Sequence, residues 1–330
     1  SELIHRGPDD AGELVDRHVS LGHRRLSVID LSRAGRQPMT RFSRTIVYNG
    51  EIYNFAALRE RLRDRGYDFI SQTDTEVVLA AYVEWGTECV QQFNGQWAFC
   101  IYDAPNQQLF LSRDRFGIKP LYYVHRGTQF AFASELKALK HLNFEQTLDE
   151  EALNFYFFQK YIGRDKTVFL GHTKLEPAHN LLLSLRSGTC TSWKYYALED
   201  DVAARQECSV KERLNDLLEV VPQAVHDRLV ADVGVGAFLS GGLDSSYIAA
   251  TVAEKQSAFR TFSIQFASPS YDESRFAAAT AEKLGVEHTT SAVNLNDELI
   301  LDTIARLDEP FGDASIVPTR VLSETTRQHV

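Results

Sequence analysis

The chain has 330 residues, of which 44% are hydrophobic and 24% charged, a balance typical of a globular protein with room for two domains. Its net charge of −10 argues against a nucleic acid or an anionic membrane as the main partner. Four cysteines without C-x-x-C spacing and the lack of a bilayer-long apolar run disfavour a disulfide framework, a zinc site or a membrane span, and favour the cytoplasm.

The first half of the chain is predicted to be rich in short β-strands that turn residues separate. Apolar residues at helical spacing indicate two helices in this half, over 58–62 and 75–85. A last strand pair is expected at 181–183 and around Trp193. The other strands are predicted at 45–48, 98–102, 109–112, 121–124 and 129–133.

The polar, acidic residues 197–208 are expected to form a linker. Beyond them, apolar residues from Leu214 to Leu229 recur at helical spacing, and Pro222 should kink this helix or divide it in two. Strands and helices then alternate, which predicts an α/β domain with a doubly wound parallel sheet. The strands are expected at 233–239, 260–266 and 286–288, and the helices at 245–254 and 274–284.

The most informative stretch of the second half is the turn after the apolar strand that ends at Leu239. Gly241 and Gly242 let the backbone approach an anion with its N–H groups outward, and the next helix start adds partial positive charge. Because the turn carries no lysine, it is not a Walker A loop. Asp244 would repel a bare phosphate, so it is expected to face a magnesium ion. A plain strand-to-helix turn with a serine or aspartate cap is the alternative.

The S-G-G-L-D-S-S stretch resembles the PP-loop of ATP pyrophosphatases, which split ATP between its α and β phosphates. The resemblance extends to Y-D-E at 271–273 and to D-E-P at 308–310, although the last could also be a solvated loop. The assignment would fail if protein acceptors held both glycine amides and left no room for a triphosphate beside Asp244. The resemblance implies ATP or pyrophosphate binding by Leu239, Ser240, Gly241, Gly242, Leu243, Asp244, Ser245, Ser246 and Ser263, with Asp244 on the metal and Asp308, Glu309 and Asp313 on the acceptor side.

The first half carries a second set of motifs. They include H-R-G-P-D-D at 5–10, G-H-R-R-L-S at 22–27, Y-N-G-E-I-Y-N at 48–54, T-D-T-E at 73–76 and R-D-R-F-G-I-K-P at 113–120. Together they resemble the glutaminase domain of asparagine synthetase, a class II glutamine amidotransferase, over residues 1–196. The resemblance implies an α+β N-terminal-nucleophile fold with αββα layers, followed by a synthetase domain over 209–330.

The chemistry of amide hydrolysis explains the Asn49-Gly50 pair in these motifs. The reaction passes through a tetrahedral oxyanion, and an asparagine amide with a glycine backbone N–H can form the hole that stabilises it. By itself, Asn-Gly is more often a two-residue hairpin turn. The resemblance implies that Asn49 and Gly50 are catalytic.

Free glutamine also offers a carboxylate and an ammonium group for recognition. A guanidinium fork suits the carboxylate, and the resemblance assigns that role to Arg25, which alone would read as a surface charge. It assigns the ammonium to Glu51 and Asp74, whereas Asp114 between two arginines is interpreted as a structural ion pair. The implied glutamine-binding set is Arg25, Leu26, Val28, Asn49, Gly50, Glu51 and Asp74.

The sequence departs from the family pattern at both ends. The family nucleophile is an N-terminal cysteine well before the H-R-G-P motif, and none of Cys89, Cys100, Cys190 and Cys208 lies in its place. An S-G-[DE]-G-x-D-E stretch, which supplies further acidic residues, does not occur before the end of the chain. We therefore expect a longer parent protein and expect the 330-residue chain alone to be inactive.

The resemblance predicts a glutamine-dependent amidotransferase, a carbon–nitrogen ligase. Glutamine hydrolysis would supply ammonia to a carboxylate adenylated with ATP and Mg²⁺, most simply converting aspartate to asparagine with release of AMP and pyrophosphate. A relative that acts on a sugar, peptide or lactam-forming acid, and a non-catalytic homologue, are the alternatives. Glutamine and aspartate are the expected partners, without nucleic acid or membrane, and a homodimer is compatible with the family.

Overall fold

The structure is a computed structural model that describes residues 2–142, 144, 146–163, 165–204, 209–256 and 258–330. The chain divides into two compact units. Unit 1 comprises Ser1–Gln206 together with Asp308–Phe311, and unit 2 comprises Glu207–Leu307 together with Gly312–Val330. No helix in the described ranges combines the length and the apolar character that crossing a bilayer requires.

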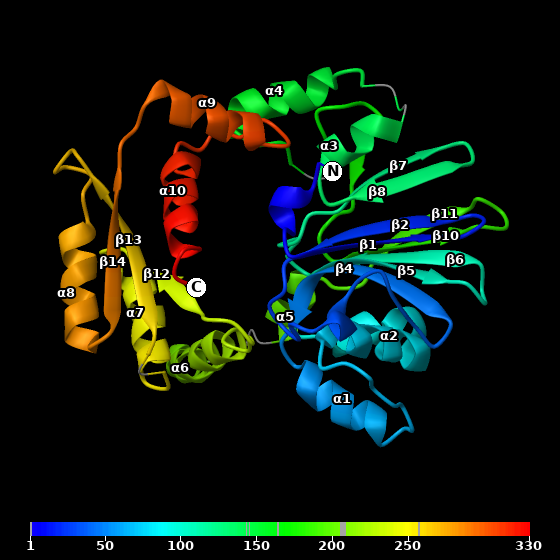
Figure 1. The fold of residues 1–330 in the computed structure, drawn as a ribbon, viewed down its shortest axis with the longest axis horizontal. Helices are drawn as coiled ribbons and strands as arrows, with labels where there is room; N and C mark the ends of the chain where they lie inside the picture. The colour runs from blue at the N-terminus through cyan, green and yellow to red at the C-terminus, as the bar shows by residue number, and fades with distance from the viewer. Residues whose placement is uncertain (1, 143, 145, 164, 205–208, 257) are drawn as a thin grey trace. The chain divides into compact units, whose positions relative to one another are not determined.

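A six-stranded antiparallel sheet forms the centre of unit 1, with strand order β11-β10-β6-β5-β4-β3. Two helices, α1 (Phe55–Arg63) and α2 (Asp74–Trp85), cover one of its faces (Figure 1). Thr73 caps α2, because its side chain accepts a hydrogen bond from Thr75 N. The six strands are β3 (Met39–Arg41), β4 (Arg44–Ile52), β5 (Gly95–Asp103), β6 (Gln108–Arg113), β10 (His179–Ser184) and β11 (Cys190–Lys194).

The central strands β4, β5 and β6 of this sheet are buried on both faces, so their side chains alternate between two cores. In β5, Trp97 and Phe99 pack against α1 and α2, whereas Ala98 and Cys100 belong to the opposite core. The apolar run that predicted a strand at 98–102 therefore reflects burial from both sides.

A second β layer lies across the opposite core. It consists of a sheet with order β8-β7-β9 and the hairpin β1–β2. Tyr123 of β7 faces the six-stranded sheet, whereas Tyr122 and Val124 pack with α3 and α4. The layers therefore follow the order helix, sheet, sheet, helix, which confirms the predicted αββα fold (Figure 1). These elements are β1 (Asp10–Val15), β2 (Ser20–Arg25), β7 (Tyr122–Arg126), β8 (Gln129–Ala133), β9 (Thr173–Lys174), α3 (Leu136–Leu139) and α4 (Glu150–Gln159), with short 3₁₀ helices at Ile4–Arg6, Arg33–Gly35, Gly86–Gln92 and Lys140–Leu142.

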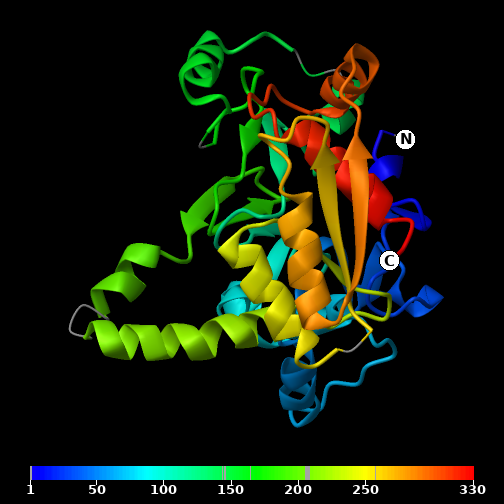
Figure 2. The ribbon, with the colours of Figure 1, turned by 90° about the vertical axis from the view of Figure 1, so that its left-hand side faces the viewer.

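Unit 2 is built on a parallel sheet with strand order β12-β13-β14. Its core lies under α7 and α8, around Leu239, Val252 and Phe259. α10 lies on the other face (Figure 2), where Phe262 packs against His329 just beyond the end of that helix. The predicted doubly wound α/β class is confirmed. The elements are β12 (Gly236–Phe238), β13 (Arg260–Phe266), β14 (Glu287–Val293), α6 (Val210–Asp227), α7 (Leu243–Ala253), α8 (Ser274–Leu284), α9 (Asp297–Arg306) and α10 (Ile316–Thr326).

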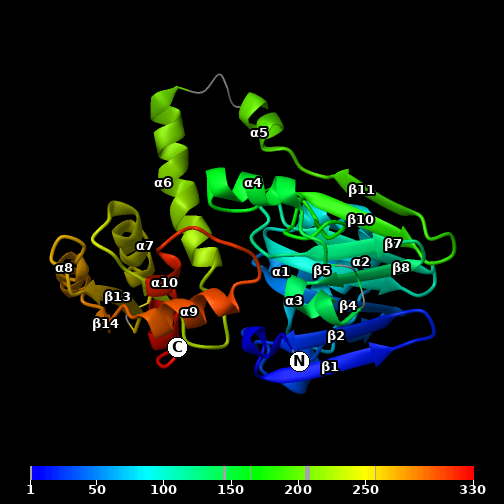
Figure 3. The ribbon, with the colours of Figure 1, turned by 90° about the horizontal axis from the view of Figure 1, so that it is seen from above.

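Two helices differ from the sequence-based expectation. α6 is one helix with Pro222 inside it, so its division into two segments is wrong (Figure 3). Leu218, four residues earlier, is exposed, and water can therefore bond the carbonyl that the proline leaves unpaired. The expected linker begins with a helix, α5 (Leu198–Ala204), and residues 205–208 lie outside the described ranges.

Candidate functional site

The Asn49-Gly50 pair lies inside a strand. Both residues belong to β4, where they pair with Ala98 and Trp97 of β5, so the hairpin-turn alternative is wrong. A Cβ added to Gly50 would lie 2.2 Å from the carbonyl oxygen of Gln96. Only glycine therefore lets the two strands approach this closely.

The side-chain amide of Asn49 is a buried hydrogen-bond donor. Within the described part of the chain, no atom accepts a hydrogen bond from Asn49 Nδ2. Buried amides normally have partners, and leaving one unpaired costs about 1–3 kcal/mol. The donor is therefore suited to an oxygen atom of a ligand, as an oxyanion hole requires.

Two carboxylates belong to the same region. Asp74, at the start of α2, is buried and accepts hydrogen bonds from Tyr48 Oη at 2.8 Å and Ile52 N at 2.9 Å. Burial raises the pKa of Asp74, and burial together with the charge of Asp74 raises the pKa of Glu51. A cationic ligand would stabilise both ionised carboxylates, so the pair is suited to an ammonium group.

Arg25 is buried at the end of β2, where its guanidinium holds the loop that follows. Its two terminal nitrogens donate to three backbone carbonyls of residues 29–32 at 2.5 to 3.1 Å. These bonds occupy the nitrogens that would bind a carboxylate. Recognition of the glutamine carboxylate by Arg25 stays a prediction. On the same loop, Leu26 is exposed and Val28 half-buried.

Asp114 organises the loop after β6. Its carboxylate has a structural role, as predicted, but it bonds backbone N–H groups, those of Trp97, Phe116, Ile118 and Lys119. Arg113 donates to backbone carbonyls, among them Lys119 O at 2.8 Å. Because Trp97 also pairs with Gly50, this loop is fixed against the strand that carries Asn49.

The three described cysteines are unsuited to nucleophilic attack. Cys89 and Cys100 are fully buried, and burial raises the pKa of both thiols far above the usual range. Burial also raises the pKa of Cys190. Cys208 lies outside the described residues. A thiolate is the reactive form, so these three side chains do not supply the nucleophile that glutamine hydrolysis needs.

In unit 2, the S-G-G turn joins the carboxyl end of β12 to the start of α7. Gly242 is the N-cap of α7, and Asp244 lies exposed in its first turn. Ligands of doubly wound sheets bind beyond the carboxyl ends of the strands, and a helix start favours an anion. The fold therefore places the turn where a phosphate group would bind.

The two glycine amides of this turn have side-chain partners. Gly241 N donates to Glu273 Oε2 at 3.2 Å, and Gly242 N donates to Ser240 Oγ at 3.1 Å. Glu273 and Ser240 are both exposed, so they can move aside when a phosphate oxygen offers a stronger, charge-assisted bond. The amides are held by exposed side chains, and the turn itself remains exposed.

Ser263 of β13 directs its hydroxyl toward β14. Its Oγ lies 3.0 Å from His288 Nε2 and 3.2 Å from Thr290 Oγ1, and the residue is only 4% exposed. A contact of Ser263 with ATP would have to use atoms other than this hydroxyl. Its assignment to the ATP site stays a prediction.

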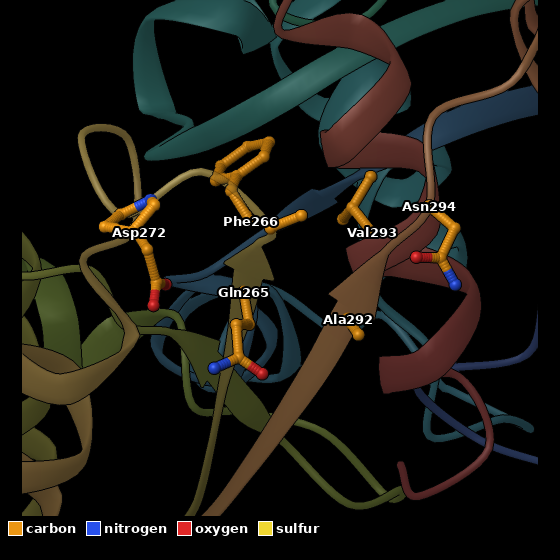
Figure 4. A pocket seen from close by; sticks show the side chains of 8 residues that line it. Gln265, Phe266, Asp272, Ala292, Val293 and Asn294 are labelled. Carbon is orange, nitrogen blue, oxygen red and sulfur yellow. The ribbon is translucent and has the colours of Figure 1, made fainter.

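A pocket of about 280 Å³ opens beyond the carboxyl ends of β13 and β14 (Figure 4). Gln265 and Phe266 line it from β13, and Val293 lines it from β14. Asp272 completes one side, and hydrogen bonds from the side chain and the backbone N–H of Ser274 to its carboxylate lower its pKa. The pocket lies at the edge of the sheet where this class of fold binds small molecules.

A magnesium ion would need ligands from a bound nucleotide. The residues that the structure describes include no group of three His, Cys, Asp or Glu side chains placed to hold a metal. Mg²⁺ commonly combines one or two carboxylates with phosphate oxygens and water. Asp244 fits such a role from the first turn of α7, and magnesium binding stays a prediction.

Two of the predicted acceptor residues, Asp308 and Glu309, are anchored within unit 1. Asp308 accepts hydrogen bonds from the first two backbone N–H groups of α3. Glu309 forms an ion pair with Lys174 at 2.6 Å and accepts a hydrogen bond from Tyr122 Oη at 3.3 Å. The solvated-loop alternative is therefore wrong. Asp313 accepts from the backbone N–H two residues later, and the acceptor role of all three stays a prediction.

Removing the cation of this ion pair should destabilise the protein. Lys174 and Glu309 are each 12% exposed, and burial already raises the pKa of Glu309. We expect Lys174→Met to lower the free energy of unfolding by about 2 kcal/mol, because it leaves a buried carboxylate without its cation. Urea unfolding measures this. The loss should shrink as the pH falls and Glu309 is protonated. Adding Glu309→Gln to Lys174→Met should restore most of the stability. A double variant that is no more stable than Lys174→Met would contradict this explanation.

Three of these side chains carried no assignment in the sequence analysis. Tyr48 bonds Asp74, and Glu273 bonds Gly241. Both adjoin the motifs Y-N-G-E and Y-D-E, so attention to motif neighbours could have found them. Lys174 lies on a two-residue strand without a motif, and only the tertiary structure identifies it.

Two protein-family models match the two parts of the chain. The model described as glutamine amidotransferase domain matches residues 1–196, and the model described as asparagine synthase matches residues 216–330. Among solved structures, glutamine phosphoribosylpyrophosphate amidotransferase from B. subtilis aligns with a TM-score of 0.39 and 13% identity, over 86% of this chain and 56% of that chain.

Curated relatives match almost the whole chain. A putative asparagine synthetase (glutamine-hydrolyzing) 2 of Methanocaldococcus jannaschii is 36% identical over 99% of this chain and 68% of its own length. Asparagine synthetase (glutamine-hydrolyzing) 1 of Bacillus subtilis is 33% identical over 99% of this chain and 52% of its own length. Amidase chry2 of Gibberella zeae is 33% identical over 98% of this chain and 50% of its own length. The chain thus spans about half to two thirds of the length of these relatives, and it belongs to the glutamine-hydrolysing asparagine synthetase family.

Proposed function

We propose that unit 1 holds the glutamine site of an amidotransferase. The α-ammonium group of glutamine would lie against Glu51 and Asp74, and its α-carboxylate would lie at the loop of Arg25. The amide carbonyl would face Asn49 Nδ2 and the backbone N–H of Gly50. The buried Asn49 donor carries this proposal, because no acceptor among the described residues accounts for it.

Hydrolysis would then follow the chemistry of acyl transfer. A nucleophile attacks the amide carbon, and negative charge develops on the oxygen that Asn49 and Gly50 face. Ammonia leaves, and water releases glutamate from the acyl intermediate. We expect the nucleophile to be the N-terminal cysteine that the family pattern implies, since the three described cysteines are unsuited to the role.

For unit 2 we propose activation of a carboxylate with ATP, which the asparagine synthase family uses. The turn 239–246 would bind the pyrophosphate part of ATP, and Asp244 would contact Mg²⁺. A carboxylate oxygen of the acceptor attacks the α-phosphorus, pyrophosphate leaves, and ammonia then displaces AMP to form the amide. The exposed turn and the pocket at the same edge of the sheet support this proposal.

Aspartate is our leading acceptor, with asparagine as the product. Relatives named asparagine synthetase support aspartate as the acceptor. Because one relative is named amidase, a different acceptor carboxylate remains the alternative. Asp308, Glu309 and Asp313 are the proposed acceptor-side residues. We further expect a cytoplasmic protein, and sedimentation of the full-length protein would test whether it forms a homodimer.

Exchange of labelled pyrophosphate into ATP by the full-length protein tests the acceptor. We expect exchange that depends on aspartate and Mg²⁺. Exchange with another carboxylate but not with aspartate would remove asparagine from the proposal. A protein that neither exchanges pyrophosphate nor releases glutamate from glutamine would be a non-catalytic homologue.

A further inference from the structure

Tyr48 lies between the two halves of the proposed glutamine site. It directly precedes Asn49 on β4, and its hydroxyl donates to Asp74 Oδ2 at 2.8 Å. Tyr48 and Asp74 are each only 4% exposed. The same carboxylate oxygen accepts the backbone N–H of Ile52 at 2.9 Å, so two donors on one strand fix its direction.

The backbone of Tyr48 is held as firmly as its side chain. Gln37 accepts from Tyr48 N through Oε1 at 2.6 Å and donates from Nε2 to Tyr48 O at 3.1 Å. β3 begins only at Met39, so the side chain of Gln37 takes the place of a strand partner. His23 Nε2 lies 3.1 Å from the same carbonyl oxygen, and burial lowers the pKa of His23 to about 4, which leaves the ring neutral.

We infer that Tyr48 is a positioning residue of the glutamine site. Its hydroxyl aims the Asp74 carboxylate at the substrate ammonium, while its clamped backbone fixes the strand from which Asn49 projects. The inference rests on the proposed glutamine site and adds to it a residue that never touches the substrate.

The hydroxyl should also keep Asp74 ionised. Burial raises the pKa of Asp74, and the hydrogen bond from Tyr48 opposes that rise. The other charged groups that act here are Glu51 on the same strand, Arg59 on α1 and Lys119, which acts on Glu51. None of them changes when the hydroxyl is removed. Loss of the hydroxyl should therefore raise the pKa of Asp74 further, and ammonium binding should weaken first at the acidic end of the pH range.

The variant Tyr48→Phe removes only this hydroxyl. In the full-length protein we expect KM for glutamine to rise about tenfold while kcat stays within about twofold, because a hydrogen bond to a charged group is lost from binding. The acid limb of the pH profile of kcat/KM should move to higher pH. Tyr82→Phe is a matched control, since Tyr82 is also 4% exposed and donates to a buried aspartate, Asp103, at 3.2 Å, at the other end of the β4–β5 pair.

Three outcomes separate the ideas. A higher KM with a shifted acid limb in Tyr48→Phe alone supports the inference. Equal effects in both variants, or a loss of thermal stability without a shifted limb, would show that Tyr48 only stabilises the core. If the unaltered full-length protein releases no glutamate from glutamine, the proposed function fails before the inference is tested.

Discussion

Replacing Asn49 with alanine is expected to lower kcat for glutamine hydrolysis about 10²- to 10³-fold, the effect of removing one oxyanion-hole donor. Asn49 Nδ2 is buried and has no acceptor among the described residues, so its removal leaves no protein group unpaired. KM for glutamine should change little, because Glu51, Asp74 and the Arg25 loop remain. Initial rates of glutamate release by the full-length protein measure both constants.

Two controls distinguish this loss from damage to the fold. Asn180 on β10 is also fully buried, and its amide atoms likewise have no partner within the described ranges. Asn180→Ala should therefore leave kcat close to that of the unaltered protein. Supplying ammonia directly should restore amide formation in Asn49→Ala, because only the glutamine step is affected. Equal losses in the two variants would show that the Asn49 amide has no special part in catalysis.

Two elements of unit 2 could be predicted closely from the sequence, whereas the strand before the glycine-rich turn, expected at 233–239, spans only Gly236–Phe238. The strand expected at 260–266 and the helix expected at 274–284 match β13 and α8 residue for residue. Their apolar residues keep one period throughout, and Gly285 ends the helix in a left-handed conformation. Local signals were sufficient here because the apolar residues of each element keep the regular spacing of a strand or a helix.

Elements with polar sequences were predicted poorly. β14 was expected at 286–288 but spans Glu287–Val293. Its residues His288 and Thr290 look like loop residues, yet both bond Ser263 across the strand pair. Polar side chains that satisfy one another inside a sheet leave no periodic apolar signal, so the sequence could not reveal the full strand.

In the candidate sites, too, some residues could be predicted from the sequence and others could not. Asn49, Gly50 and the S-G-G turn carry recognisable motifs, but their supports do not. Gln37 bonds the backbone of Tyr48 across eleven residues, and Glu273 reaches Gly241 across thirty-two. A supporting side chain needs only the right position in space and can lie anywhere in the sequence, so the structure was needed to find it.

Replacing Asp244 with asparagine is expected to slow pyrophosphate exchange into ATP at least about 100-fold, because charge stabilisation by a metal ion is worth several kcal/mol. Asparagine keeps the shape of the residue and its place in the first turn of α7. The change removes the negative charge, and with it the proposed Mg²⁺ contact. Exchange measured over a range of Mg²⁺ concentrations should show weaker binding of the metal, as a higher Mg²⁺ concentration for half-maximal exchange. The maximal rate of exchange should also be lower.

Asp297→Asn is the matched control for this variant. Asp297 is another exposed aspartate in the first turn of a helix of unit 2, so its loss removes the same favourable interaction with a helix start. It should leave exchange unchanged. Asp244→Asn should also abolish amide formation from free ammonia, which Asn49→Ala retains, because activation of the carboxylate precedes attack by ammonia. If Asp244→Asn kept normal exchange with an unaltered dependence on magnesium, the metal would have to be held elsewhere, and the S-G-G turn would bind phosphate through its amides and hydroxyls alone.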